Sequence, residues 1–261
     1  MLTSPPRQSS LAVGGGSTIT RSSASAFRVF EVSPTGDLTL NGVIVSNGEA
    51  RRGALETTSG GGGLLIVGGR VTLKGGTFAD NRVIGAPDTT AEGGAILNEA
   101  GTLDIRGTLF ERNSTIERGQ TIPGPTRASS QGGAIYNDGG VFTARGCTFV
   151  GNVADSPERT GMGGAVFNIG NATLDGCTFS ANVARGAVSA FGGALTNQGV
   201  VHVSACTARD NVTVAGRSES AGGAFFNNEG TMFVSGCVID TTRRTPCQAW
   251  PTVVASTTTP V

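Results

Sequence analysis

Four cysteines recur at a regular interval in the second half of the chain, and their thiols are candidates for metal binding or for nucleophilic chemistry. Cys147, Cys177, Cys206 and Cys237 are separated by 30, 29 and 31 residues. A structural zinc site is normally built from closely spaced cysteine pairs, which this spacing does not supply. One cysteine per repeat instead predicts a column of reduced, buried thiols that act as small apolar side chains.

The single histidine and the acids do not form a catalytic motif in the sequence. His202 has no nucleophile motif such as Gly-x-Ser-x-Gly beside it. Glycoside hydrolysis needs two carboxylates within about 5–10 Å of each other, whereas Asp104 and Asp175 are separated by two copies of a repeat. The sequence therefore predicts no catalytic residue, no metal site and no bound cofactor.

Composition restricts the class of protein further. The 261 residues carry 19 Lys and Arg against 19 Asp and Glu, and this balance argues against a nucleic-acid-binding protein. Glycine is abundant at 42 residues, which indicates many tight turns. No apolar stretch is long enough for a membrane-spanning helix, and residues 1–10 do not resemble a signal peptide. A mildly basic strip is predicted on the middle repeats: Arg70, Lys74, Arg106 and Arg145.

Two short motifs recur along the chain. The first is Gly-Gly-Ala followed by an aliphatic or aromatic residue, with copies that begin at Gly93, Gly132, Gly163, Gly192 and Gly222. We assign a degenerate copy to Gly62-Gly63-Leu64-Leu65. An asparagine follows two residues after each full copy: Asn98, Asn137, Asn168, Asn197 and Asn227. The second motif, Phe-x-x-Asn, ends at Asn81, Asn113, Asn152 and Asn182, and a variant without the phenylalanine ends at Asn211.

A strand with alternating apolar and polar residues lies between the two motifs. Its apolar pairs, which we expect to face inward, are Leu38/Leu40, Val71/Leu73, Leu103/Ile105, Phe142/Ala144, Ala172/Leu174, Val201/Val203 and Met232/Val234. Seven copies that follow one inside-outside rule indicate seven equivalent strands.

This repetition predicts an all-β chain folded as a right-handed, single-stranded parallel β-helix, with roughly 6–7 coils of about 30 residues. Gly-Gly pairs and β-branched runs exclude helical repeats, and a propeller blade would need about 40 residues. Stacked coils place equivalent asparagines above one another, so we expect an asparagine ladder at each of two turns.

The repeats divide the chain into three parts. Residues 1–26 are expected to form a partial N-terminal coil or cap, residues 27–240 the β-helix, and residues 241–261 an irregular tail. The longest step between glycine pairs contains the segment 114–131, which predicts a protruding loop with Glu117 as its one acid.

The residue that follows the aliphatic or aromatic residue of the Gly-Gly-Ala motif is a candidate for a binding surface. This position holds Ile66, Leu97, Tyr136, Phe167, Thr196 and Phe226. If the ladder asparagines face inward, Leu97, Tyr136, Phe167 and Phe226 form an exposed stripe that could contact a partner. Two alternatives stay open: the loops after Asn81 or Asn113 cover the stripe, or the alternation runs the other way and these side chains are core.

The paired motifs over residues 60–240 resemble the repeat of the chlamydial-type polymorphic outer-membrane proteins. This resemblance implies a β-helix passenger exposed on the cell surface or secreted, with a role in adhesion. The expected partner is an extended one, such as a glycan or a cell-surface protein. The alternative function is a carbohydrate-active enzyme, either a polysaccharide lyase or a glycoside hydrolase of the pectate-lyase-like β-helix class.

Overall fold

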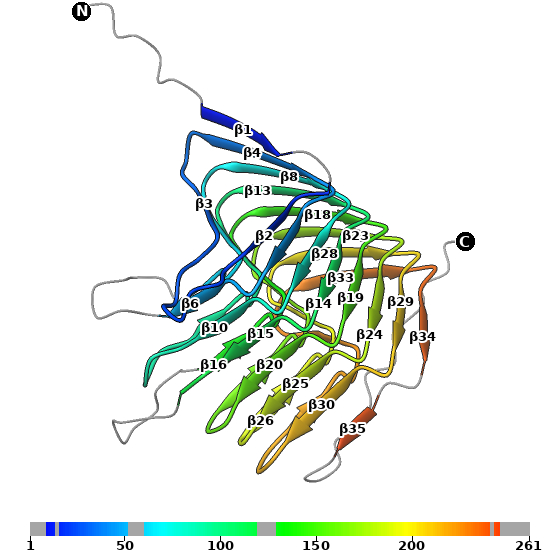
Figure 1. Cartoon of the computed structure of the whole chain (residues 1–261). Helices are drawn as coiled ribbons and strands as arrows, with labels where there is room; N and C mark the ends of the chain where they lie inside the picture. Colours follow the sequence, from blue (N-terminus) through cyan, green and yellow to red (C-terminus); the bar gives the residue numbers. More distant parts are fainter. Residues whose placement is uncertain (1–8, 14–15, 52–59, 119–128, 241–242, 246–261) are drawn as a thin grey trace, which may run out of the picture.

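The computed structural model describes residues 9–13, 16–51, 60–118, 129–240 and 243–245, and within them every regular element is a β-strand. All strand pairs are parallel and join equivalent positions of successive coils, for example Leu174 with Val203. The chain is therefore a parallel β-helix, as the repeats predict, with its coils stacked from the N-terminal to the C-terminal end (Figure 1).

Five sheets run along the helix, and we name them A to E. Sheet A contains β1 (Ser9–Val13), β4 (Gly36–Asn41), β8 (Arg70–Lys74), β13 (Thr102–Arg106), β18 (Val141–Arg145), β23 (Asn171–Asp175), β28 (Val200–Ser204) and β33 (Thr231–Ser235). Sheet B contains β2 (Thr18–Thr20), β5 (Ile44–Ser46), β9 (Thr77–Ala79), β14 (Leu109–Glu111), β19 (Thr148–Val150), β24 (Thr178–Ser180), β29 (Thr207–Arg209) and β34 (Val238–Asp240). Sheet C contains β3 (Phe30–Val32), β7 (Leu64–Val67), β12 (Ile96–Glu99), β17 (Ile135–Asp138), β22 (Val166–Asn168), β27 (Leu195–Asn197) and β32 (Phe225–Asn227).

The other two sheets lie between the Phe-x-x-Asn motif and the next glycine pair. Sheet D contains β6 (Glu49–Arg51), β10 (Arg82–Ile84), β15 (Ser114–Ile116), β20 (Val153–Ser156), β25 (Val183–Gly186), β30 (Val212–Ala215) and β35 (Arg243–Thr245). Sheet E contains β11 (Ala91–Glu92), β16 (Ser129–Gln131), β21 (Thr160–Met162), β26 (Ser189–Phe191) and β31 (Ser220–Ala221). Each coil therefore runs through sheets C, A, B, D and E before it returns to sheet C.

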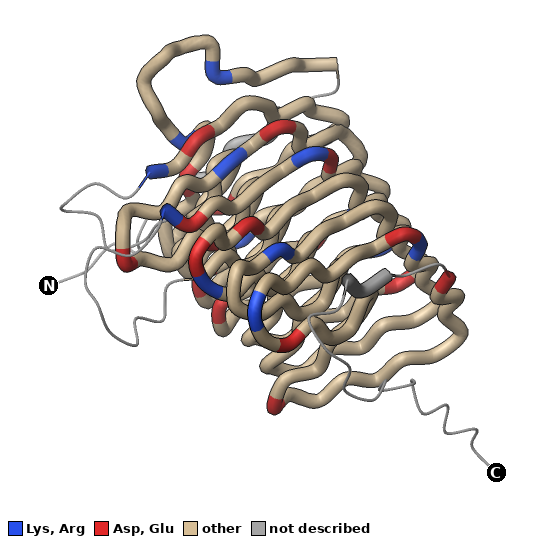
Figure 2. The backbone as a smooth tube through the Cα atoms, turned by 90° about the horizontal axis from the view of Figure 1, so that it is seen from below, with Lys and Arg blue, Asp and Glu red and all other residues tan. Residues whose placement is uncertain are grey.

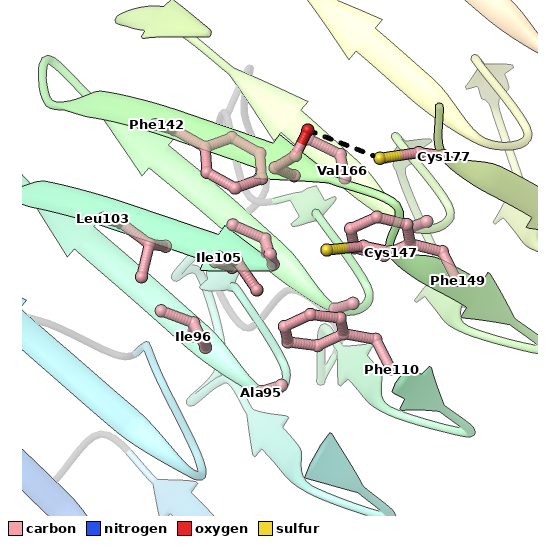
Figure 3. Packing of buried hydrophobic residues seen from close by; sticks show 14 of the residues in the cluster. Ala95, Ile96, Leu103, Ile105, Phe110, Phe142, Cys147, Phe149, Val166 and Cys177 are labelled. Carbon is pink, nitrogen blue, oxygen red and sulfur yellow. Dashed lines mark hydrogen bonds between the residues drawn. The ribbon is translucent and has the colours of Figure 1, made fainter. Parts of the chain in front are cut away.

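The main core fills the space enclosed by sheets A, B and C (Figure 3). The predicted inward residues of sheet A are buried in all coils except the last, where Met232 and Val234 are half-buried. The phenylalanines of the Phe-x-x-Asn motif stack with nearly parallel rings, whose centroids are 5.0 Å apart between Phe110 and Phe149 and 4.8 Å apart between Phe149 and Phe179. Offset stacking of this kind explains why one aromatic residue recurs at one position.

The structure contains strands in two segments that the sequence predicted to be irregular. The predicted loop 114–131 begins with β15 and ends with β16, because both short segments pair with the neighbouring coils. Residues 119–128 of this insert lie outside the described residues. At the C-terminal end, β35 pairs with β30, so residues 243–245 of the predicted tail continue sheet D.

The degenerate glycine motif is shifted by one residue from our assignment. Leu64 pairs with Ile96, and Ile66 pairs with Asn98, so the motif is Gly61-Gly62-Gly63-Leu64. The backbone agrees, because Gly61 has a φ of 64°, similar to the 55° of Gly93. Ile66 consequently occupies the asparagine-ladder position in this coil, and Leu65 occupies the stripe position.

Candidate functional surfaces

The glycine pairs that define the first motif are required by close contact between coils. A Cβ on Gly164 would lie 2.1 Å from the carbonyl oxygen of Gly193, and a Cβ on Gly133 would lie 2.2 Å from that of Gly164. The first glycine of each pair has a positive φ, 62° at Gly163, which L-residues rarely adopt. These glycines are therefore structural, and nothing in their surroundings indicates a bound ligand.

The asparagines that follow the glycine pairs form one continuous hydrogen-bonded ladder. The Nδ2 group of each donates to the Oδ1 atom of the next, at 2.7 Å from Asn98 to Asn137, 2.8 Å from Asn137 to Asn168, and 2.7 Å from Asn168 to Asn197. Asn227 receives the last of these bonds from Asn197, at 2.7 Å. All but Asn227 are fully buried, so this amide column replaces water inside the turn.

A second ladder runs through the asparagines of the Phe-x-x-Asn motif. It joins Asn81, Asn113, Asn152, Asn182 and Asn211, with Nδ2 to Oδ1 distances of 2.9 to 3.1 Å. Each Oδ1 after that of Asn81 also accepts the backbone N–H of the preceding asparagine, as in the 3.0 Å bond from Asn152 to Asn182. Both ladders hold turns in place, and neither offers its amides to a partner.

The predicted aromatic stripe is inside the protein, and its assignment as an exposed binding surface is wrong. Leu97 and Phe167 are 0 % exposed and Tyr136 is 5 % exposed. They form a second small core with Leu65, against which Met162 of sheet E packs. Phe226 in the last coil is half-buried and stacks on Phe191 of sheet E, with ring centroids 4.7 Å apart.

The reason is that sheet E folds over the outer side of sheet C. The chain that follows each Phe-x-x-Asn motif returns through sheets D and E and covers the stripe, which is one of the alternatives left open by the sequence. Burial raises the pKa of Tyr136 far above its usual range, so its phenol stays neutral. A partner can reach Leu97, Tyr136 or Phe167 only after this cover has opened.

The cysteine column contains reduced thiols, as its spacing indicates. Cys147, Cys177 and Cys206 are buried, and Cys237 in the last coil is partly exposed. The Sγ atom of Cys177 lies 3.5 Å from the Ala144 carbonyl oxygen to which it donates, drawn as a dashed line in Figure 3. Hydrogen bonds with the thiols of Cys147 and Cys206, together with burial, raise the pKa of Cys177, so this sulfur is a poor nucleophile.

The acids and the histidine considered for catalysis lie on the outer face of sheet A but do not converge. Asp104 stands in one column with Thr143, Thr173 and His202, whereas Asp175 stands in the neighbouring column, two coils away. His202 stacks on Phe233, with ring centroids 4.6 Å apart. Within the part of the chain that the structure describes, no three Cys, His, Asp or Glu side chains are grouped to hold a metal ion.

A buried ion cluster near the N-terminal end was not predicted from the sequence. The Glu49 side chain is 1 % exposed and contacts three guanidinium groups, those of Arg21, Arg51 and Arg82. Burial alone would raise the pKa of Glu49, but hydrogen bonds from Arg82 and Arg51 outweigh it and lower the pKa. The sequence carries no signal for this cluster, because Arg21 comes from a loop of the preceding coil.

The same region contains a shallow polar groove of about 450 Å³. Its lining residues are Arg21, Ser22, Ser23, Asn47, Asp80, Arg82, Arg112 and Ser114. Arg112 forms a two-pronged ion pair with Asp80, with both N–O distances 2.9 Å, and also contacts Glu111. The guanidinium groups of Arg21, Arg82 and Arg112 are thus already paired with acids of the chain.

The predicted basic strip is exposed on the outer face of sheet A. Lys74, Arg106 and Arg145 are direct register partners on β8, β13 and β18, and Arg70 stands at the other end of β8. Asp104 stands in the neighbouring column, with its carboxylate oxygens 3.3 Å from a guanidinium nitrogen of Arg106 and 3.5 Å from one of Arg145. Along the whole chain, residues of both charge signs are scattered among a majority that are neither acidic nor basic (Figure 2).

No helix in the described part of the chain is long and apolar enough to cross a membrane. Comparison with curated proteins and with solved structures gave no match. A sequence model of the Chlamydia polymorphic membrane protein repeat matches residues 107–138. This stretch holds one copy of each motif, from Phe110 to Asn113 and from Gly132 to Asn137. The chain is therefore a parallel β-helix that carries a repeat similar to that of the chlamydial polymorphic membrane proteins.

Proposed function

We propose that this chain is a non-catalytic β-helix scaffold, displayed on a cell surface or secreted, that binds an extended partner such as a glycan or a cell-surface protein. The proposal rests on the positions of the repeated residues in the fold. Glycine pairs, asparagines, phenylalanines and cysteines all serve turns or cores, as the contacts of Gly164, Asn168 and Phe149 illustrate. The repeat thus builds a long regular body, and the outer face of sheet A remains available for contact.

The match to the chlamydial repeat supports a surface or adhesin-like role, because it covers one copy of each motif, from Phe-x-x-Asn in one coil to the glycine pair of the next. The geometry of the outer face of sheet A supports it independently. Outward side chains there are aligned in straight columns, with equivalent strands about 4.8 Å apart. Such a face suits a long ligand that makes the same weak contact several times, since each added contact multiplies the affinity.

A binding and turnover comparison tests the proposal. The chain is applied to a glycan array and to intact cultured cells to measure binding. In parallel, it is incubated with a panel of polysaccharides, which are assayed for new reducing ends and for unsaturated products. We expect binding without turnover. Product release that disappears in an Asp104→Asn or Asp175→Asn variant would instead identify an enzyme. Failure to bind any glycan or cell surface would refute the scaffold function.

A further inference from the structure

The outer face of sheet A carries a concentration of positive charge in a chain whose net charge is zero. We define the basic patch as Arg70, Lys74, Arg106 and Arg145. These four cations share β8, β13 and β18 with a single carboxylate, Asp104, so the net charge of the three strands is 4 − 1, or +3. The patch is three coils long because Asp37 on β4 and Asp175 on β23 border it.

The arrangement of charges within the patch lowers the stability of the fold. Lys74 pairs in register with Arg106, and Arg106 pairs in register with Arg145, so three like charges stand in one column. Like charges opposite each other on neighbouring strands repel and destabilise a sheet. Asp104 relieves part of this repulsion through Arg106 and Arg145. Among the residues that the structure describes, Lys74 and Arg70 have no acid within ion-pair distance.

The charged groups are also accessible. The side chains of Arg106 and Arg145 are 61 % and 47 % exposed, and Lys74 and Arg70 are exposed as well. Between the charges stand the half-buried hydroxyl side chains of Thr72, Thr102 and Thr143. Cations flanked by hydroxyl groups on a flat face can bind both the acidic groups and the hydroxyl groups of a sugar polymer.

We infer that the basic patch is a binding site for a linear anionic polysaccharide whose sulfate or carboxylate groups lie along the column of Lys74, Arg106 and Arg145. This inference rests on the scaffold function proposed above and specifies its ligand class. The column spans two strand spacings, about 10 Å, so it engages two to three successive sugars. A nucleic acid fits less well, because the patch has no aromatic side chain on which a base could stack and the chain as a whole is neutral.

The first experiment measures binding of the full chain to heparin as the sulfated probe, to polygalacturonate as the carboxylated probe and to dextran as the neutral one. We expect binding to at least one anionic polymer and none to dextran. Raising NaCl from 50 to 200 mM should weaken the binding roughly 10- to 50-fold, because three or four counterions are released. Binding to dextran of equal strength, or binding that is insensitive to salt, would overturn the inference.

Variants locate the site and control for total charge. Arg106→Gln should weaken binding about fivefold, and Arg106→Gln combined with Arg145→Gln should abolish it. Asp104→Asn should strengthen binding, because it removes the one carboxylate of the patch. Arg209→Gln removes an exposed arginine from sheet B and should leave binding unchanged. Equal losses in the Arg106 and Arg209 variants, with both still folded by circular dichroism, would place the site elsewhere.

The chain provides its own reporter for this surface, because Lys74 is its only lysine. An amine-specific reagent therefore modifies Lys74 and the N-terminus alone, and mass spectrometry separates the two. The anionic polysaccharide should protect Lys74 from modification while the N-terminus stays reactive. Equal competition by duplex DNA or polyglutamate would refute the polysaccharide class. Binding of neutral glycans or cells that is unaffected by these variants would refute the patch and leave the scaffold function standing.

Discussion

Replacement of Asn168 by alanine tests whether the buried ladder determines stability. Asn168 accepts a hydrogen bond from Asn137 at 2.8 Å and donates one to Asn197 at 2.7 Å. Alanine removes both of these bonds, together with the bonds that Asn168 Nδ2 donates to the carbonyl oxygens of Gly170 and Val200. One Asn137 proton and the Asn197 Oδ1 atom are then left buried without their ladder partner. Each unpaired buried group costs about 1–3 kcal/mol, so the free energy of unfolding should fall by about 2–6 kcal/mol.

The matched control lies at the open end of the same ladder. Asn227 is exposed; it accepts the bond from Asn197 and donates one to the Gly230 carbonyl oxygen at 2.6 Å, and water can replace its amide in both when it becomes alanine. We expect Asn227→Ala to cost less than about 1 kcal/mol. Both variants are measured by urea denaturation followed by circular dichroism, with the slope of the unfolding free energy against urea checked for change. A cost for Asn168→Ala no greater than that for Asn227→Ala would show that water solvates the ladder and would refute the reasoning.

Three further predictions concern the second core, the ion cluster and a strained turn. Phe167→Ala should lower the unfolding free energy by about 3–5 kcal/mol in urea denaturation, because a fully buried ring is lost; a cost below 1 kcal/mol would mean that the cover of sheet E is loose. Glu49→Gln should cost about 1–3 kcal/mol at pH 7. The folded pKa of Glu49 is lowered, so the stabilisation by its carboxylate is present above the unfolded pKa and is lost as pH falls through the folded pKa. The difference in unfolding free energy between the native chain and the Glu49→Gln variant should therefore shrink in acid. A difference that stays constant with pH would contradict the ion cluster. Ala205 has a φ of 49° at a position where other coils use glycine, such as Gly176 with a φ of 60°. Ala205→Gly should therefore raise the free energy of unfolding by about 0.5–1 kcal/mol. A lower melting temperature in thermal denaturation would show instead that the alanine methyl group is needed.

The sequence was sufficient to predict the stacked strands of sheets A, B and C. A residue type that recurs every 30 residues is informative because coil stacking places each residue on its own equivalent. Phe110 and Phe149 therefore had to stack, and Leu103 and Phe142 had to face inward. The exposed basic strip was also readable, because charged residues such as Arg106 alternate with apolar ones along each strand.

Sheets D and E were not predicted, and the error about the stripe follows from that omission. Their strands are short and built from small or mixed side chains, as in Ser129–Gln131 and Ser220–Ala221, so no alternation marks them. The register of the first glycine motif was also ambiguous, because Gly60 to Gly63 are consecutive glycines and only pairing with Ile96 selects one frame.

The sequence by itself determined the period, the inward and outward sides of the strands and the identity of the stacked columns, since these depend only on the repeat of side-chain types. The tertiary structure alone decided which outward side is solvent and which is covered. Leu97 and Arg106 both point away from the main core, yet sheet E covers Leu97 and leaves Arg106 in water. The physical reason is that burial on the outer side depends on where the returning chain packs, and that contact joins segments of different composition with no common period.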